Sequence, residues 1–222
     1  MQFCKRLIPW LCMLAVLTGC ALPQLQQGTA NKAAESAQAD ADFEPIPDPY
    51  LAHTKPPSQA ARTDFELAQQ AMLAQQWQQA RGLLEQMTQI YPELSGPYVN
   101  LALVYRQLNQ DETAAEALER AIAVNPLNGE AYNQLAILRR EQGNFAEAEK
   151  LYLQALEVWP HNPTVHRNLG ILYDLYMGRL ADALRHYQMS QKISGESERR
   201  IQGWIVDLQR RINDRQAAAK SQ

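Results

Sequence analysis

From residue 61 onward, apolar and small residues recur at helical spacing, and the whole pattern returns every 34 residues. A leucine followed by a small residue marks each period, and an alanine lies thirteen or fourteen residues further on. The series are Leu67, Leu101, Leu135 and Leu169, then Ala80, Ala114, Ala148 and Ala183, then Pro92, Pro126 and Pro160. This period predicts a helical repeat whose apolar face is buried only against its neighbours. Such a chain is expected to offer a binding surface rather than a catalytic pocket.

Each unit is expected to fold as two antiparallel helices. In the third unit, Tyr132, Leu135 and Ala136 share one helix face. Gly143 then permits a tight turn, and Pro160 ends the second helix. The predicted fold class is all-α: a solenoid of about four helix pairs, over residues 61–94, 95–128, 129–162 and 163–194.

These residues resemble the tetratricopeptide repeat, whose signature places an aromatic residue, Leu-Gly, Tyr, Ala, a second aromatic and Pro at fixed offsets. The resemblance implies helix pairs stacked into a right-handed superhelix. Arg139 stands where the signature has Tyr, and Asp64 stands where the first unit should have an aromatic residue. The fourth unit has one extra residue before Gly178, which a bulge or a longer first helix would absorb.

After the repeats, residues 195–214 predict one capping helix. Its apolar stripe contains Ile201, Trp204, Ile205, Leu208 and Ile212. The end of a solenoid needs a polar-faced helix of this kind. The arginines of this region are interpreted as a solvated face, with contact to anionic lipid or peptidoglycan as the alternative. Residues 215–222 are expected to fray.

The N-terminus predicts a targeting segment, residues 1–19. Lys5 and Arg6 precede the apolar run 7–17, which is shorter than the roughly 20 residues that a bilayer requires. Leu17-Thr18-Gly19-Cys20 follows and resembles a bacterial lipobox. The resemblance implies cleavage before Cys20 and lipid attachment to it. An ordinary secretory signal or a short membrane anchor is the alternative.

The residue after the cysteine is Ala21 rather than Asp, which in the lipoproteins resembled implies the outer membrane, facing the periplasm of a Gram-negative bacterium. Residues 20–60 are rich in Gln, Ala, Asp and Pro and predict a flexible tether. The alternative is that residues 43–50 dock on the first repeat as an N-terminal cap.

Composition limits the classes of function that the chain can have. The chain has 21 basic and 24 acidic residues, and this balance argues against nucleic-acid binding. Of its three cysteines, only Cys20 would remain after processing, so we expect neither a disulfide framework nor a cysteine nucleophile. The four histidines form no HExxH motif, and His166 is interpreted as a packing residue. We therefore predict no enzyme activity, no metal, no cofactor and no small-molecule substrate.

The resemblance places a partner-binding groove on the first helix of each unit. The implied groove residues are Val99, Leu103, Arg106, Asn133, Ile137, Arg140, Arg167, Ile171 and Asp174. Apolar side chains would anchor an extended peptide or a helix, and the polar ones would bind its backbone or carboxylates. The arginines among them are expected outside the core.

The function predicted is that of a periplasmic adaptor lipoprotein, anchored to the outer membrane, that binds protein or peptide partners. It would act in assembly of an envelope machine such as the type IV pilus, whose repeat-bearing pilotin lipoproteins it distantly resembles. The alternatives are an adaptor that organises peptidoglycan hydrolases or synthases, and an enzyme or regulator with a non-obvious site.

Overall fold

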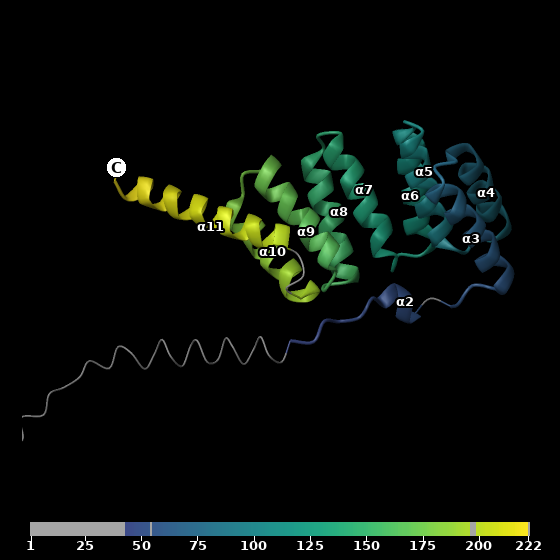
Figure 1. The fold of residues 1–222 in the computed structure, drawn as a ribbon, viewed down its shortest axis with the longest axis horizontal. Coiled ribbons are helices and arrows are strands. Elements are labelled where there is room, and N and C mark those ends of the chain that lie inside the picture. The colour runs from purple at the N-terminus through teal and green to yellow at the C-terminus, as the bar shows by residue number, and fades with distance from the viewer. Residues whose placement is uncertain (1–42, 54, 196–198, 222) are drawn as a thin grey trace, which may run out of the picture. The chain divides into compact units, whose positions relative to one another are not determined.

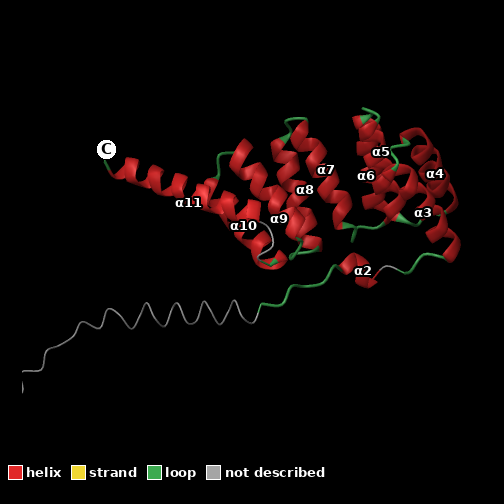
Figure 2. Cartoon of the chain, in the orientation of Figure 1, coloured by secondary structure: helices red, strands yellow, loops and turns green. Residues whose placement is uncertain are grey.

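The computed structural model describes residues 43–53, 55–195 and 199–221, and every regular element within them is helical (Figures 1 and 2). The chain divides into two units, 1–44 and 45–222, and the second holds all the helices discussed below. The predicted signal peptide, the lipidation site at Cys20 and the tether up to residue 42 lie outside the described residues. None of the described helices is long and apolar enough to cross a bilayer.

Four helix pairs follow one another along the chain, which confirms the predicted all-α repeat fold. The pairs are α3 (Gln59–Leu73) with α4 (Trp77–Ile90), α5 (Ser95–Gln107) with α6 (Asp111–Val124), α7 (Gly129–Glu141) with α8 (Phe145–Val158), and α9 (Pro163–Ile171) with α10 (Leu180–Ser194). Each second helix also contacts the first helix of the next pair. The stacking buries one apolar face after another, as the period requires.

The small residues of the repeat lie where the helices approach each other most closely. Ala80, Ala114, Ala148 and Ala183 are fully buried. Leu67 of the first pair is by contrast 48% exposed, whereas its counterpart Leu135 is buried. The difference arises because, among the described residues, no helix pair precedes the first pair to cover Leu67.

The turn between the two helices of every pair needs one residue in the left-handed region. These residues are Gln75 (φ 57°), Asn109 (φ 59°), Gly143 (φ 82°) and Gly178 (φ 65°). Glycine adopts this conformation freely, and asparagine tolerates it better than most residues. Gln75 therefore holds a strained backbone that the repeat geometry imposes.

The departures from the repeat signature each have a structural reason. Tyr105 and Tyr173 occupy the signature position in the second and fourth pairs, and their hydroxyls donate to Glu85 (3.0 Å) and Glu149 (2.7 Å) on the preceding pair. In the third pair, Arg139 contacts Glu119 of the preceding pair at 3.3 Å. Arginine therefore replaces tyrosine because either side chain can donate to a carboxylate on the neighbouring repeat.

The extra residue of the fourth unit is absorbed as a bulge, which is one of the two expected outcomes. A π-helical turn, η2 (Leu172–Tyr176), continues α9, and the Met177 N–H donates to the Leu172 carbonyl five residues back at 3.1 Å. A π-turn adds one residue without breaking the helix. It leaves Leu175 and Tyr176 exposed.

The C-terminal helix, α11 (Arg199–Lys220), continues past the predicted end at residue 214. Ile201, Ile205 and Leu208 are buried, and the Trp204 ring lies 5.2 Å from that of Tyr187 on α10. The expected frayed tail is helical through Lys220, because the segment 215–220 (RQAAAK) consists of strong helix formers.

Part of the expected tether is ordered against the repeats. Residues 45–48 and the short helix α2 (Pro49–His53) cross the ends of the repeat helices (Figure 1). We call residues 45–53 the strap. The docking alternative considered for residues 43–50 therefore takes a different form, because Ile46 bonds to the loop between the third and fourth pairs and Tyr50 lies beside Ser95 of the second pair.

Candidate functional site

The predicted groove residues do not gather in one hollow. Leu103 and Arg106 of α5 line a cavity of about 380 Å³ between the first and second pairs, which we call the inner hollow. Its other lining residues are Met72, Trp77, Gln107 and Asp111. An apolar floor with one arginine, one amide and one carboxylate suits a peptide side chain with a polar end.

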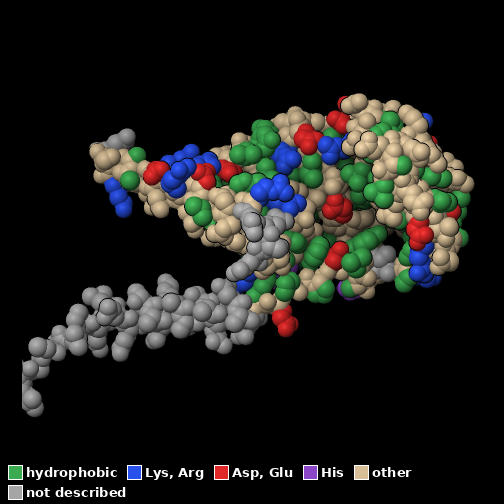
Figure 3. Space-filling view, in the orientation of Figure 1, with side chains coloured by type: hydrophobic (Ala, Val, Ile, Leu, Met, Phe, Trp, Pro, Cys, Tyr) green, Lys and Arg blue, Asp and Glu red, His purple; other side chains and the backbone are tan. Residues whose placement is uncertain are grey.

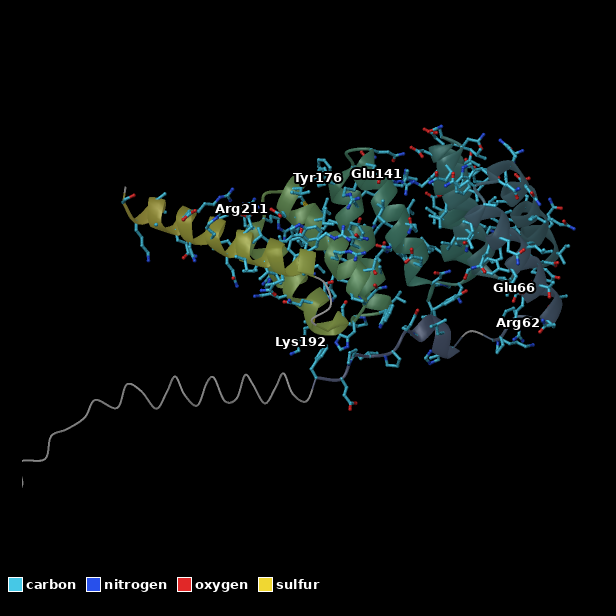
Figure 4. The ribbon with its side chains drawn as sticks, in the orientation of Figure 1. Arg62, Glu66, Glu141, Tyr176, Lys192 and Arg211 are labelled. Carbon is cyan, nitrogen blue, oxygen red and sulfur yellow. The ribbon has the colours of Figure 1, made fainter. Side chains whose placement is uncertain are left out.

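Next to the inner hollow, two arginines share one acceptor. Glu141 at the end of α7 accepts a hydrogen bond from Arg106 and lies 3.9 Å from Arg140. The Arg140 guanidinium lies over the ring of Tyr176, 5.9 Å from its centre, which is within the range of a cation–π contact. Figure 4 shows Glu141 and Tyr176 at the ends of their helices.

Several predicted groove side chains are more buried than binding to a partner requires. Only 14% of the Arg140 side chain is exposed, and its Nε and Nη1 atoms are buried without a hydrogen-bond partner among the described residues. Asn133 is buried, and its side-chain oxygen accepts from Asn168 at 2.8 Å. Val99 is buried as well. Arg140 is thus half-buried at the edge of the core, beside Glu141 and the Tyr176 ring, rather than part of the apolar core.

Ile137, Arg167 and Ile171 are half-buried. Ile137 and Ile171 pack against the core. Neither isoleucine lines the inner hollow. Of the three half-buried apolar residues predicted for the groove, only Leu103 therefore faces that hollow.

At the far end of the groove, the last predicted groove residue, Asp174, is paired with an arginine of α11. Arg211 donates to Asp174 at 2.7 Å and also contacts Asp207 at 3.4 Å. Figure 3 shows Lys and Arg side chains gathered along α11. Arg210 likewise pairs with Asp207, at 2.6 Å. These contacts fit the interpretation of the α11 arginines as a solvated, partly neutralised face.

His166 lies in the core of the fourth pair, as its interpretation as a packing residue requires. Its Nδ1 is 2.9 Å from Nδ1 of His186, and its Nε2 is 2.9 Å from the Pro160 carbonyl oxygen. Burial lowers the pKa of His166 and lowers the pKa of His186 to about 4. Both imidazoles are therefore neutral at pH 7.

Sequence reasoning missed a second site, at the loop between the third and fourth pairs. The Trp159 Nε1–H donates to the Ile46 carbonyl at 2.7 Å, and the Ile46 N–H donates to His161 Nδ1 at 2.7 Å. The Tyr50 hydroxyl lies 3.4 Å from Ser95 Oγ. Comparison of the three inter-repeat loops would have singled out Trp159 and His161, but nothing in the sequence indicates what they bind.

The fold and both sites define a repeat scaffold that binds through its surface. Sequence profiles of the tetratricopeptide repeat match residues 95–138 and 128–196. Residues 95–196 therefore carry tetratricopeptide repeats, in the all-helical solenoid that the resemblance implied.

Solved structures share this fold. The structure titled "Functional Characterization of Pseudomonas Aeruginosa pilF" has a TM-score of 0.63 and 22% identity, and the match covers 70% of each chain. A structure of MamA residues 41 to the end from Desulfovibrio magneticus RS-1 has a TM-score of 0.58 and 13% identity, covering 73% of this chain and 91% of that one. At these identities the similarity concerns the fold alone.

Among curated relatives, the BBSome complex member BBS4 of Bos taurus is 34% identical over 94 residues. The match covers 42% of this chain and 18% of the relative, so this chain spans less than a fifth of that protein.

Proposed function

We propose that this protein is an adaptor that holds a protein or peptide partner on the inner surface of its repeats. The inner hollow carries this proposal. At about 380 Å³ it falls within the usual size range of ligand sites, and Leu103 and Met72 offer apolar contact beside the Arg106 guanidinium. Tetratricopeptide repeats provide stacked helices and little else, which favours binding over catalysis.

We further propose that the protein is lipidated at Cys20 and held at the outer membrane, facing the periplasm. The lipobox-like run Leu17-Thr18-Gly19-Cys20 and the following Ala21 support this location. A lipoprotein that carries tetratricopeptide repeats fits assembly of an envelope machine such as the type IV pilus. The fold similarity to the structure titled for pilF is in keeping with that assignment.

Two matched leucine substitutions test the binding surface. Leu103→Glu places a carboxylate in the inner hollow, while Leu153→Glu places one on an exposed position of α8. We expect Leu103→Glu to reduce capture of envelope partners by the mature protein, and Leu153→Glu to leave capture unchanged. Circular dichroism checks that both variants fold. Equal capture by the two folded variants would exclude the inner hollow.

The anchor has its own test. Cys20→Ser removes the acceptor thiol, so we expect loss of labelling by a palmitate analogue and release from the outer-membrane fraction. Undiminished labelling of Cys20→Ser would refute lipidation at this cysteine and would leave the binding proposal standing.

A further inference from the structure

The two shortest hydrogen bonds of the strap are made by the main chain of a single residue. The N–H and C=O of Ile46 bond to His161 Nδ1 and to Trp159 Nε1, both at 2.7 Å. In an extended chain these two groups of one residue point to the same side, as in a hydrogen-bonded pair of an antiparallel sheet. Trp159 and His161 therefore act together as a two-pronged receptor for extended backbone.

The residues of the strap suit that receptor. Pro45 and Pro47 flank Ile46 and hold it in an extended conformation, because a residue before proline avoids the helical region. The Ile46 side chain is 49% exposed, so the receptor reads backbone shape more than side-chain identity. Four residues later, Tyr50 is half-buried beside Ser95 and Gly96.

Among the three inter-repeat loops, this receptor occurs once. The residues that correspond to Trp159 in the first two loops are Tyr91 and Asn125. The Tyr91 hydroxyl donates to Asp64 at 2.9 Å, and the Asn125 side chain accepts from Leu127 N at 3.0 Å. In the hydrogen bonds described, these two side chains bind residues of the repeats, whereas Trp159 and His161 both bind Ile46 of the strap. Equivalent positions of the repeat therefore do not need a tryptophan, because Tyr91 and Asn125 stand there in the other two loops.

The strap is also weakly attached. No residue of α2 is buried, and the two hydrogen bonds of Ile46 are exposed. Between the strap and the repeats lies a cavity of about 200 Å³, bordered by Asp48, Tyr50, Asn128 and Trp159 among others. Two exposed hydrogen bonds and the long Tyr50–Ser95 contact over a partly empty cavity make a segment easy to displace.

We propose that Trp159, His161 and Ser95 form a docking site for a partner's extended peptide, in which one residue lies between two prolines and a tyrosine follows four residues later. The strap occupies this docking site in the free protein and is displaced when the partner binds. The docking site lies apart from the inner hollow, which the strap does not line, so this proposal is independent of the proposed function.

A labelled peptide with the sequence of residues 43–53, titrated by fluorescence polarisation into the mature chain, tests the proposal. Ile46→Pro in the protein removes the N–H donor and frees the docking site. We expect this variant to bind the peptide at least tenfold more tightly than wild type, because the tethered strap competes at a high effective concentration. Adding Trp159→Phe should weaken binding about three- to tenfold, through loss of one hydrogen bond.

Two controls make the result specific. Trp77→Phe, at the inner hollow, should leave peptide affinity unchanged. A peptide with proline in place of Ile46 should bind more weakly than the natural one. The proposal is overturned if the Ile46→Pro variant shows no millimolar binding, or if Trp159→Phe has no effect. Concentration-dependent dimers of wild type that Ile46→Pro abolishes would also overturn it, because a second copy would then be the occupant.

Discussion

Gly170 offers a sharp test of the helix packing in the fourth pair. It occupies the small-residue position that Ala68, Ala102 and Ala136 fill in the other pairs. A Cβ atom added at Gly170 would lie 2.6 Å from both Cδ1 and Cε1 of Tyr187. Real Cβ atoms do not approach aromatic carbons so closely, so the ring or the helix must shift.

The expected effect follows from two opposing terms. Replacing a helical glycine with alanine stabilises a helix by about 0.5–1 kcal/mol. Overpacking a close contact costs about 1–3 kcal/mol or more, and Tyr187, 2% exposed and packed against the Trp204 ring, has little space to move. We therefore expect Gly170→Ala to destabilise the protein by about 1–2 kcal/mol, a fall of roughly 2–8 °C in melting temperature.

Thermal unfolding followed by circular dichroism provides the assay. Gly203→Ala is the matched control, because Gly203 is exposed on α11 and no atom lies within 4 Å of its added Cβ. It should raise the melting temperature slightly. A Gly170→Ala protein as stable as the Gly203→Ala control would show that α9 and α10 do not approach each other as described.

Three further predictions concern stability. Ala148→Leu should destabilise the third pair by about 1–3 kcal/mol, because Ala148 is fully buried between helices; an unchanged melting temperature would mean the wrong repeat register. Gln75→Gly should raise the free energy of unfolding in urea by about 0.5–1 kcal/mol, because glycine adopts the left-handed backbone conformation of this position without strain. A lower free energy of unfolding would contradict the strain assigned to Gln75. Burial lowers the pKa of His186 from 6.5 to about 4, so this contribution to stability is full above about pH 6.5 and falls by about 3 kcal/mol towards pH 4. His186→Gln should flatten that pH profile, and an equally steep profile would assign the titration to other groups.

The repeat architecture was predictable because every unit must bury an apolar helix face of the same pattern. The recurring Leu, Ala and Pro positions specify which face is buried and where each helix ends, and four copies reinforce one another. Even the extra residue before Gly178 could be located, because a fixed period exposes any insertion. The choice of a π-turn over a longer helix depends on packing against α10, which the sequence does not display.

The candidate sites were less predictable, because they depend on contacts between distant segments. Asn133 has a polar side chain of the kind common in binding sites, yet its side-chain oxygen accepts a hydrogen bond from Asn168 of the next pair. The Arg140 guanidinium lies over the ring of Tyr176, which the π-turn carries. The strap contacts join residues more than 110 positions apart, Ile46 with Trp159 and His161. Composition alone made residues 45–53 resemble a tether, since a proline-rich segment reads as extended whether or not a receptor holds it.

The central claim is that a partner is held on the inner surface of the repeats, and site-specific cross-linking measures this most directly. A photoreactive benzoylphenylalanine replaces Leu103 in the inner hollow or Leu153 on the exposed side of α8, in the full-length protein in its native cells. We expect a discrete cross-linked partner from position 103 upon irradiation and none from position 153. Cross-links from position 153 alone would exclude the inner hollow and place the binding surface at α8.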